Sequence, residues 1–533
     1  MRTKNLSTYK NLQSATAILF YLVLAKLLIH FLTMSEYGFH RDEFLYLAMG
    51  ERLDWGYLEV PPSIAYMAQL SRLFFGESLF AVRMQPVLSG ALMVLFTGLL
   101  AREFGGKRFA QFLAALAVLI SPAYLRSNML FTPVVFDQLY WLLGAYLVVK
   151  AINSGDNKFW LAFGVLSGIA LLNKYTMLLF GFGMLFGLLL TSERKMLQTP
   201  APWQAAAIAF CIFLPNLIWQ YVHGWPVVDH MQALGKHQFV HVQSLGFLVM
   251  QFLMNLFTAP IWILGIYFYF SKTGEPYRAI GWIYLVALIV LLLFSGKAYY
   301  LLPAYPLLFA GGAVIFENFF QAARQRSWLK PALVSGMIFG SAIFIPYGVP
   351  ILPVNRMVQY MDFMANKIGL SEPLRWENGQ IHDMPQEFAD MFGWENQVKT
   401  VADVYRQLTL GEQAQCLILA SNYGEAGAIN YYRKQYDLPK AISFNGSYFL
   451  WGPGAPIVCA VDEDIKKAPA VSGDILITIG IPEKALTAYY HQVELAAIIT
   501  HQYARENNVP VFICRGAKFS PEELWPKLSK FRF

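Results

Sequence analysis

The sequence predicts a polytopic α-helical membrane protein with a C-terminal soluble α/β domain. Of its 533 residues, 56% are hydrophobic and only 14% are charged, whereas soluble domains carry about 25% charged residues. Aromatic residues make up 16% of the chain, and Trp and Tyr are enriched where helices cross a bilayer interface. The composition also changes along the chain. We therefore divide it into a membrane domain, residues 1–353, and a soluble domain, residues 354–533.

The membrane domain contains about eleven apolar runs, most of them near the ~20 residues that a helix needs to cross a bilayer. They lie near residues 14–33, 80–101, 109–125, 133–152, 159–173, 176–191, 203–220, 244–270, 279–295, 299–316 and 331–347. The first run has no small-residue cleavage site, so we expect an uncleaved anchor rather than a signal peptide.

The distribution of basic residues predicts the orientation. Alternate connectors are rich in lysine and arginine: Arg2, Lys4 and Lys10; Arg102, Lys107 and Arg108; Lys150 and Lys158; Arg194 and Lys195; Lys272 and Arg278; Arg324, Arg326 and Lys330. All of them fall on one side of the membrane if the N-terminus is cytoplasmic, as the positive-inside rule requires. An odd number of spans then places the soluble domain outside, which in a bacterium is the periplasmic face of the inner membrane.

Two long loops lie on the opposite side, at about 34–79 and 221–243. In the first, one apolar pattern follows Asp42 and another follows Pro61-Pro62, both at helical spacing. These patterns are typical of short amphipathic helices that lie on a membrane surface.

Strand and helix patterns alternate beyond residue 354, which predicts a small α/β domain. The expected strands are Cys416–Ala420, Pro456–Val461, Ile475–Ile479 and Val509–Cys514, and Glu494–Glu506 is expected to be helical. Ser520 precedes Pro521 and Glu523, a good helix start. Cys416, Cys459 and Cys514 lie in apolar runs and are expected to be buried thiols rather than disulfide partners.

The polar residues of the outer loops indicate the chemistry. His40-Arg41-Asp42-Glu43 places two adjacent carboxylates just past the first span, and isolated cations occur on the outer side against the positive-inside bias. A carboxylate base and cations that hold a lipid-linked phosphate are the groups that glycosyl transfer needs. A lipid-linked sugar flippase or transporter would also use such charges and is the alternative. Nothing in the sequence supports nucleic-acid binding.

Several segments resemble bacterial members of glycosyltransferase family 39, which includes protein O-mannosyltransferases, the aminoarabinose transferase acting on lipid A and rhizobial lipopolysaccharide galacturonosyltransferases. The matching segments are HRDEFLYLAMGERLDWGYLEVPPSIAYM (40–67), FTPVVFDQLYW (131–141), LLNKYTMLL (171–179), SGKAYYLLPAYPLL (295–308) and SNYGEAGAINYYRKQYDLP (421–439). The resemblance implies the C-type glycosyltransferase fold, a polyprenyl-phosphate sugar donor, and inversion at the anomeric carbon. The acceptor would be lipid A or lipopolysaccharide, another glycolipid or a protein.

In this resemblance Asp42 matches the family's catalytic base, and Glu43 is the second catalytic candidate. The alternatives are that Asp42 caps the helix after it and that Glu43 is a solvated helix-start carboxylate. Glu59 matches an acidic residue of the substrate site. The next residue is Val60, where the aminoarabinose transferase has a phosphate-contacting lysine.

The donor phosphate would be bound by Lys297 and Tyr300, which match the lipid-phosphate segment, and by the outer-side cations Lys174 and Arg126. A lysine at a span end can instead extend to the interface without binding anything. Asp137, at the start of a span, and His223 and His237, in the second outer loop, are the remaining substrate-site candidates. The histidines leave a divalent cation open as a cofactor, and the metal, if any, is undetermined.

The orientation predicts the behaviour of reporter fusions. A reporter active only in the periplasm should be active when fused after Phe533 and silent when fused near Lys195. The reason is that an odd number of predicted spans separates these two positions in the chain. Matched cytoplasm-active fusions at both positions should give the opposite pattern. A silent periplasmic reporter at the C-terminus would contradict this topology.

Overall fold

The computed structural model describes residues 2–237, 239–241, 243–322, 325, 328–453 and 473–533. The chain divides into two compact units. Unit 1 comprises Met1–Glu36, Phe80–Ile218 and Gly235–Pro353. Unit 2 comprises Tyr37–Leu79, Trp219–Leu234 and Val354–Phe533. The first outer loop thus packs with the C-terminal segment.

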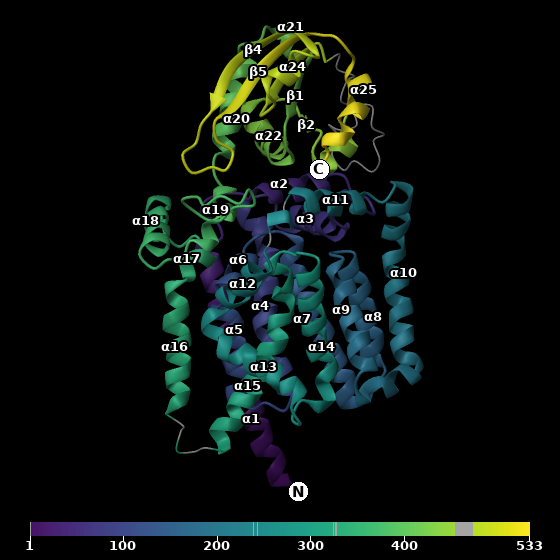
Figure 1. Ribbon diagram of the computed structural model, residues 1–533, viewed down its shortest axis with the longest axis vertical. Helices are drawn as coiled ribbons and strands as arrows, with labels where there is room; N and C mark the ends of the chain where they lie inside the picture. Colours follow the sequence, from purple (N-terminus) through teal and green to yellow (C-terminus); the bar gives the residue numbers. More distant parts are fainter. Residues whose placement is uncertain (1, 238, 242, 323–324, 326–327, 454–472) are drawn as a thin grey trace. The chain divides into compact units, whose positions relative to one another are not determined.

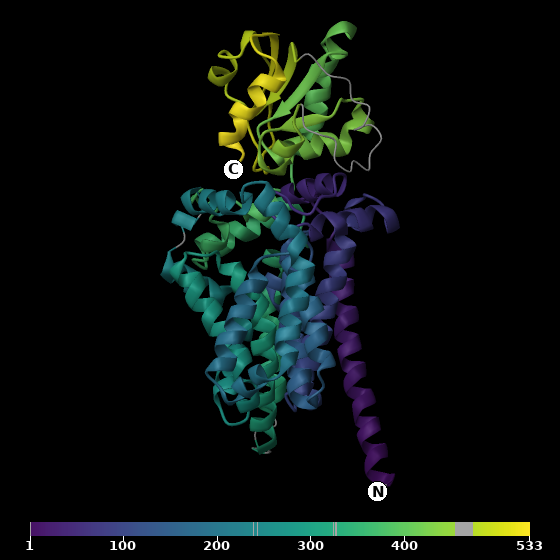
Figure 2. The same cartoon turned by 90° about the vertical axis from the view of Figure 1, so that its right-hand side faces the viewer.

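Unit 1 is built from apolar helices that lie side by side (Figure 1), with α1 as the long N-terminal helix (Figure 2). They are α1 (Arg2–Thr33), α4 (Leu79–Glu103), α5 (Arg108–Ile120), α6 (Pro122–Ser127), α7 (Pro133–Ser154), α8 (Lys158–Leu171), α9 (Thr176–Leu189), α10 (Pro200–Val222), α12 (Ser244–Met254), α13 (Ala259–Phe270), α14 (Arg278–Leu293), α15 (Tyr305–Ala322), α16 (Leu329–Ile343) and α17 (Ile345–Gly348). A 3₁₀ segment, η5 (Ala298–Ala304), precedes α15.

The apolar helices coincide with the predicted spans. Among the described residues, five helical segments are long and apolar enough to cross a membrane, two bent helix pairs pass the same test together, and four shorter helices are apolar. Each of the eleven predicted runs lies on one of these segments. The run at 244–270 is broken near Asn255, where its two halves differ in direction by 74°. The predicted polytopic helical fold is confirmed.

Glycines let two of these helices pack at close range. A Cβ on Gly265 of α13 or on Gly312 of α15 would overlap a backbone carbonyl oxygen of the opposite helix. Small residues at such positions bring helix backbones together, and this packing replaces the hydrophobic effect as the source of association in lipid.

Unit 2 contains a five-stranded mixed sheet of order β2-β1-β3-β5-β4 with helices packed on it (Figure 1). The strands are β1 (Cys416–Ala420), β2 (Ala441–Ser443), β3 (Ile475–Ile479), β4 (Tyr490–Ile499) and β5 (Val509–Ala517). The helices are α2 (Arg41–Gly50), α3 (Ser63–Phe74), α11 (Pro226–His237), α18 (Val354–Asn366), α19 (Gln386–Ala389), α20 (Trp394–Arg406), α21 (Leu410–Gln413), α22 (Tyr423–Tyr436), α24 (Glu483–Leu486) and α25 (Pro521–Leu524). Strands β1, β2 and β3 are parallel, whereas β5 pairs antiparallel with β3 and β4.

Three of the predicted strands are confirmed, because β1, β3 and β5 carry them. The fourth, Pro456–Val461, lies outside the described residues, as does Cys459. The predicted helix at Glu494–Glu506 is wrong: residues 494–499 belong to β4, which pairs with β5, and residues 500–506 are not helical. Good helix formers become an edge strand here because pairing with a neighbour outweighs local propensity. The Ser520 capping box is confirmed, and Cys416 and Cys514 are buried free thiols.

Helix α2 does not have the predicted surface location. Residues Glu43–Gly50 are all buried, and α2 packs against α3 and α22. Two glycines of α22 permit this contact: a Cβ on Gly424 would lie 2.6 Å from Arg41 Cγ, and one on Gly427 would lie 2.6 Å from Phe44 Cβ. Helix α3 is amphipathic as predicted. It leaves Leu73 and Phe74 exposed, so its contact with a membrane surface stays a prediction.

The close approach of α2 and α22 can be tested by Gly427→Ala. Alanine favours a helix by about 1 kcal/mol over glycine, but the new methyl group would be forced against Phe44. We expect a net destabilisation of about 1–3 kcal/mol, the usual range for overpacking. It should appear as a lower melting temperature in detergent and as faster amide hydrogen exchange in α2.

The matched control is Gly411→Ala in α21, where an added Cβ meets nothing within 4 Å. This variant should melt as the wild type does or slightly higher. Equal exchange rates for α2 in Gly427→Ala and the wild type would contradict the proposed packing constraint.

Candidate functional site

The first turn of α2 determines where Asp42 lies. His40 is the N-cap: its Nδ1 accepts a hydrogen bond from Asp42 N (3.1 Å), and its own N–H donates to Glu43 Oε2 (2.8 Å). The alternative reading of Asp42 as the helix cap is therefore wrong. Glu43 is buried and completes a capping box, a structural role. The half-exposed Asp42 carboxylate lies in the first helical turn, where the helix dipole favours a negative charge.

One side chain from the C-terminal segment binds the Asp42 carboxylate. The Tyr423 hydroxyl donates to Asp42 Oδ1 at 2.8 Å. Tyr423 is the first residue of α22, whose N-cap Asn422 accepts hydrogen bonds from Gly424 N and Glu425 N. Within the described residues, no second side chain hydrogen-bonds to this carboxylate. Its other oxygen can therefore accept a proton from a substrate.

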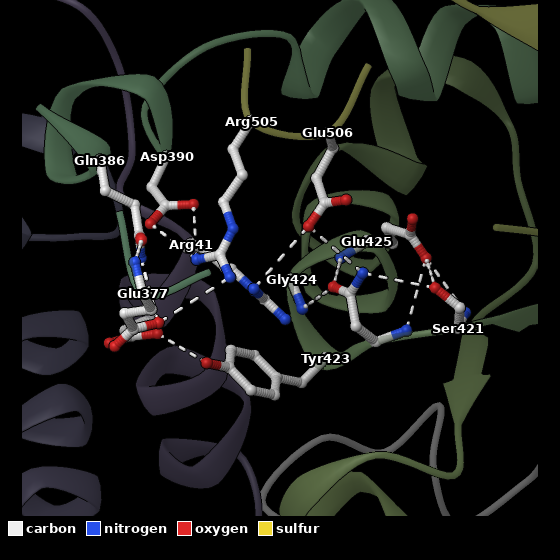
Figure 3. Close-up of polar contacts among 12 residues, drawn as sticks. Arg41, Glu377, Gln386, Asp390, Ser421, Tyr423, Gly424, Glu425, Arg505 and Glu506 are labelled. Atoms are coloured by element: carbon white, nitrogen blue, oxygen red, sulfur yellow. Dashed lines mark hydrogen bonds and ion pairs between the residues drawn. The ribbon is translucent and has the colours of Figure 1, made fainter. Parts of the chain in front are cut away.

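The neighbouring Arg41 is surrounded by acidic and aromatic groups, as Figure 3 shows. Its guanidinium carbon lies 4.7 Å from the centre of the Tyr423 ring, and its Nη1 lies 3.8 Å from Glu506 Oε1. Its backbone N–H donates to the Asp390 carbonyl at 3.1 Å. Asp390 in turn pairs with Arg505 at 3.2 Å and lies 3.8 Å from His40 Nε2. These contacts join the start of α2 to three separate parts of the C-terminal segment.

Burial changes the protonation of two carboxyls in this network. It raises the pKa of Asp390, and the charges of His40, Arg505 and Arg41 oppose that rise. Burial, and next the charge of Glu506, raise the pKa of Glu425 to about 8. Glu425 accepts hydrogen bonds from the backbone N–H and the hydroxyl of Ser421. A largely protonated Glu425 at neutral pH avoids two like charges in one buried cluster.

Glu59 lies next to this cluster and connects the first loop to the turn after β2. Both of its oxygens accept from Ser447: Oε1 from the backbone N–H at 2.7 Å, and Oε2 from the hydroxyl. Gly446 has φ +59°, and a Cβ there would overlap Glu59 Oε1, so this approach requires glycine. Burial raises the pKa of Glu59, and the charge of Asp42 adds to that rise. Glu59 is thus close enough to Asp42 to interact with it electrostatically.

In unit 1, three residues that the sequence analysis named separately lie together. Lys174 Nζ lies 4.6 Å from the centre of the Tyr300 ring and 5.5 Å from that of Tyr299. Asp137, buried at the start of α7, accepts a hydrogen bond from Thr176 Oγ1 at 2.7 Å and interacts electrostatically with Lys174. A lysine over two aromatic faces is stabilised by cation–π attraction.

The other predicted cations of unit 1 differ in their surroundings. Lys297 is half-buried at the N-cap of η5, and its carbonyl accepts from Tyr300 N at 3.0 Å. Lys297 therefore lies on the same turn as Tyr300. Arg126 donates to the Tyr347 carbonyl. Its guanidinium is thereby bound to the short helix α17.

The two histidine candidates do not form a metal site in the described part of the chain. His223 is exposed, stacks on Trp219 with ring centres 4.0 Å apart, and contacts the Trp219 carbonyl through Nδ1 (2.8 Å). His237 ends α11, and its side chain is outside what the structure describes. Among the described residues, no group of three or more His, Cys, Asp or Glu side chains could hold a metal ion.

Sequence reasoning missed the C-terminal partners of the first loop, namely Asp390, Tyr423, Arg505, Glu506 and Ser447. These residue types are common in soluble domains, and the sequence around them does not indicate which residues they contact. The one usable signal was the pair of glycines Gly424 and Gly427, since residues three positions apart lie on one helix face and two glycines there allow another backbone to come close.

Comparison with known proteins supports this architecture. Residues 59–219 match the family model described as dolichyl-phosphate-mannose-protein mannosyltransferase. The chain is 26% identical over 254 residues to the lipid A galacturonosyltransferase RgtD of Rhizobium johnstonii. The match covers 47% of this chain and 51% of RgtD, so the chain spans about half the length of this curated relative.

Among solved structures, the chain is similar to ArnT from Cupriavidus metallidurans. With ArnT bound to undecaprenyl phosphate, the TM-score is 0.60 at 14% identity, covering 93% of this chain and 98% of ArnT. With the apo form, the TM-score is 0.60 at 15% identity, covering 94% and 98%. The C-type glycosyltransferase fold expected from the sequence is confirmed, and so is the resemblance of this chain to the dolichyl-phosphate-mannose-protein mannosyltransferase family, whose model it matches over residues 59–219.

Proposed function

We propose that this protein is an inverting glycosyltransferase that moves a sugar from a polyprenyl-phosphate carrier to an acceptor at the periplasmic face of a bacterial inner membrane. The observation that carries the proposal is the Asp42 carboxylate, half-exposed in the first turn of α2 and bound through one oxygen. The names of the relatives support the substrates: RgtD acts on lipid A, and ArnT was solved with undecaprenyl phosphate. Lipid A is therefore the first acceptor to test.

In the proposed reaction Asp42 is the general base. It takes the proton of an acceptor hydroxyl while that oxygen forms a bond to the anomeric carbon. On the opposite face of the sugar, the bond between the anomeric carbon and the phosphate oxygen breaks, and its electron pair leaves with the polyprenyl phosphate. The products are the inverted glycoside, polyprenyl phosphate and a protonated Asp42, which returns its proton to water.

We assign the donor phosphate to the segment that contains Lys297 and Tyr300, with Lys174 and Arg126 as further cations. Within the described residues Lys174 makes no salt bridge: it faces the aromatic rings and interacts with Asp137. Such a cation is available to an anionic ligand and can stabilise the charge that develops on the leaving phosphate. Asp137 then positions Lys174, and Glu59, bound by Ser447, positions the loop that carries Asp42.

Asp42→Asn should abolish most of the activity. Asparagine keeps the size of the side chain and can still accept the Tyr423 hydrogen bond, but it cannot take the proton. Base assistance supplies about 10²–10⁴-fold in rate, so kcat should fall at least about 100-fold. Purified protein in liposomes would be given undecaprenyl-phosphate-linked [¹⁴C]galacturonic acid and lipid A, and label in lipid A would be measured. Donor binding should be unchanged.

Asp54→Asn is the matched control, because Asp54 lies in the same loop and, among the described residues, its carboxylate accepts from the adjacent Trp55 N–H and interacts with Tyr57. It should transfer sugar at the wild-type rate. Near-normal transfer by Asp42→Asn would mean that Asp42 is a structural residue and not the base. Movement of the labelled lipid across the bilayer without transfer would instead favour the transporter alternative.

Lys297→Met tests the donor phosphate separately from the base. Methionine keeps much of the apolar stem and removes the charge. Charge-assisted contacts are roughly twice as strong as neutral hydrogen bonds, so the undecaprenyl-phosphate sugar should bind at least about tenfold more weakly, with slower transfer as well. Tight binding measured by microscale thermophoresis would shift the assignment to Lys174 or Arg126. Lys272→Met, which changes an exposed lysine of a basic connector, should bind donor normally.

A further inference from the structure

The partner of Asp42 comes from the far end of the chain, 381 positions away. Resting on the proposed function, we infer that Tyr423 is a positioning residue for the base: its hydroxyl orients the Asp42 carboxylate and stabilises its ionised form. The C-terminal α/β segment thereby completes the catalytic site rather than serving only to bind an acceptor or a partner. The inference depends on four features of the structure.

The first feature is that the backbone of Tyr423 is fixed. It begins α22, and the capping box of Asn422 and Glu425 sets that helix start. The next residue, Gly424, approaches Arg41 so closely that a Cβ would lie 2.6 Å from Arg41 Cγ. Because this first turn of α22 is fixed, the Tyr423 side chain has few directions in which its ring can point.

The second feature is that the ring itself is held. The Arg41 guanidinium lies over it, and Glu506 pairs with the same guanidinium (Figure 3). A shift of the Tyr423 hydroxyl would therefore disturb an ion pair and a cation–π contact together. With Oδ1 of Asp42 bound to this hydroxyl, the carboxylate plane is restricted and Oδ2 is the oxygen left to meet an acceptor hydroxyl. Misplacing a reacting group by about 1 Å can cost about 100-fold in rate.

The third feature is the charge state of the tyrosine. Burial, and next the negative charge of Asp42, raise the pKa of Tyr423 well above its usual value. The hydroxyl thus stays protonated and donates at every working pH, and it is not itself a candidate base. A hydrogen bond donated to a carboxylate favours the ionised carboxylate.

The fourth feature is that the other charged groups facing Asp42 are of mixed sign. Arg41 on its own helix is positive, whereas Glu59 of the same loop and Asp390 before α20 are carboxyls that interact with it. Of these groups, Tyr423 is the one in hydrogen-bond contact with the Asp42 carboxylate.

The test is Tyr423→Phe, which keeps the ring under Arg41 and removes only the hydroxyl. We expect kcat to fall about tenfold, the effect of one hydrogen bond to a charged group. The acid limb of the pH–rate profile should move to higher pH by on the order of one unit, because a less stabilised carboxylate is protonated more readily. Binding of undecaprenyl-phosphate-linked galacturonic acid should not change.

Tyr431→Phe is the matched control. It removes a hydroxyl from the same helix, where Tyr431 donates to the Glu77 carbonyl at 2.9 Å. Its rate and pH profile should equal those of the wild type. An equal loss in both variants would mean that any weakening of the contact between α22 and the first loop lowers activity, and it would overturn a specific role for Tyr423.

A second measurement does not depend on catalysis. A carbodiimide modifies protonated carboxyls, so the pH midpoint of Asp42 labelling, read by mass spectrometry of the full-length protein, reports the ionisation of Asp42. The midpoint should rise in Tyr423→Phe and stay unchanged in Tyr431→Phe. If the wild type transfers no sugar, the proposed function fails, but the midpoint still decides whether Tyr423 stabilises the carboxylate. An unchanged midpoint in Tyr423→Phe would overturn the inference.

Discussion

The contact between α2 and α22 is the constraint on which the rest of unit 2 depends. Two glycines of α22 bring its backbone against Arg41 and Phe44, and this approach places the Tyr423 hydroxyl on Asp42. The same packing buries α2 almost completely. A loop between two apolar spans would otherwise have little to fix its conformation. Here it becomes part of the core of unit 2, so a carboxylate near the start of the chain is held by residues near its end.

The polar network around this contact determines which residues of α2 and α22 face each other. Buried ion pairs lose as much in desolvation as they gain in attraction, so Arg41, Asp390 and Arg505 need not add to stability. Their effect is selective: a shift of α22 by one turn would leave Asp42 without the Tyr423 hydroxyl and Arg41 without the Tyr423 ring. Because unpaired buried charges are strongly unfavourable, the network excludes these alternatives. For a residue that receives a proton in the proposed reaction, a defined position matters more than stability.

The parts of this structure that the sequence predicted are those determined locally. Long apolar runs predicted the spans, and short apolar runs predicted β1, β3 and β5, because each depends on residues within one segment. The Ser520 capping box is equally local. The strand β4 was mistaken for a helix because its identity comes from pairing with β5. Asp42 was named through a family resemblance, but Tyr423, 381 positions away, could not be, since no local pattern records a contact of that length.

The two groups of cations in the chain also differ in a way that bears on mechanism. Arg41 and Arg505 of unit 2 form ion pairs with the carboxylates of Glu506 and Asp390, so their charges fix the first loop against the C-terminal segment. Lys174 of unit 1 faces aromatic rings and, among the described residues, has no salt bridge. A cation paired with a carboxylate gains little from a phosphate, whereas one that faces aromatic rings and makes no direct ion pair gains more. In the proposed reaction, proton transfer and phosphate stabilisation therefore fall to different segments, each with the charge environment that its chemistry requires.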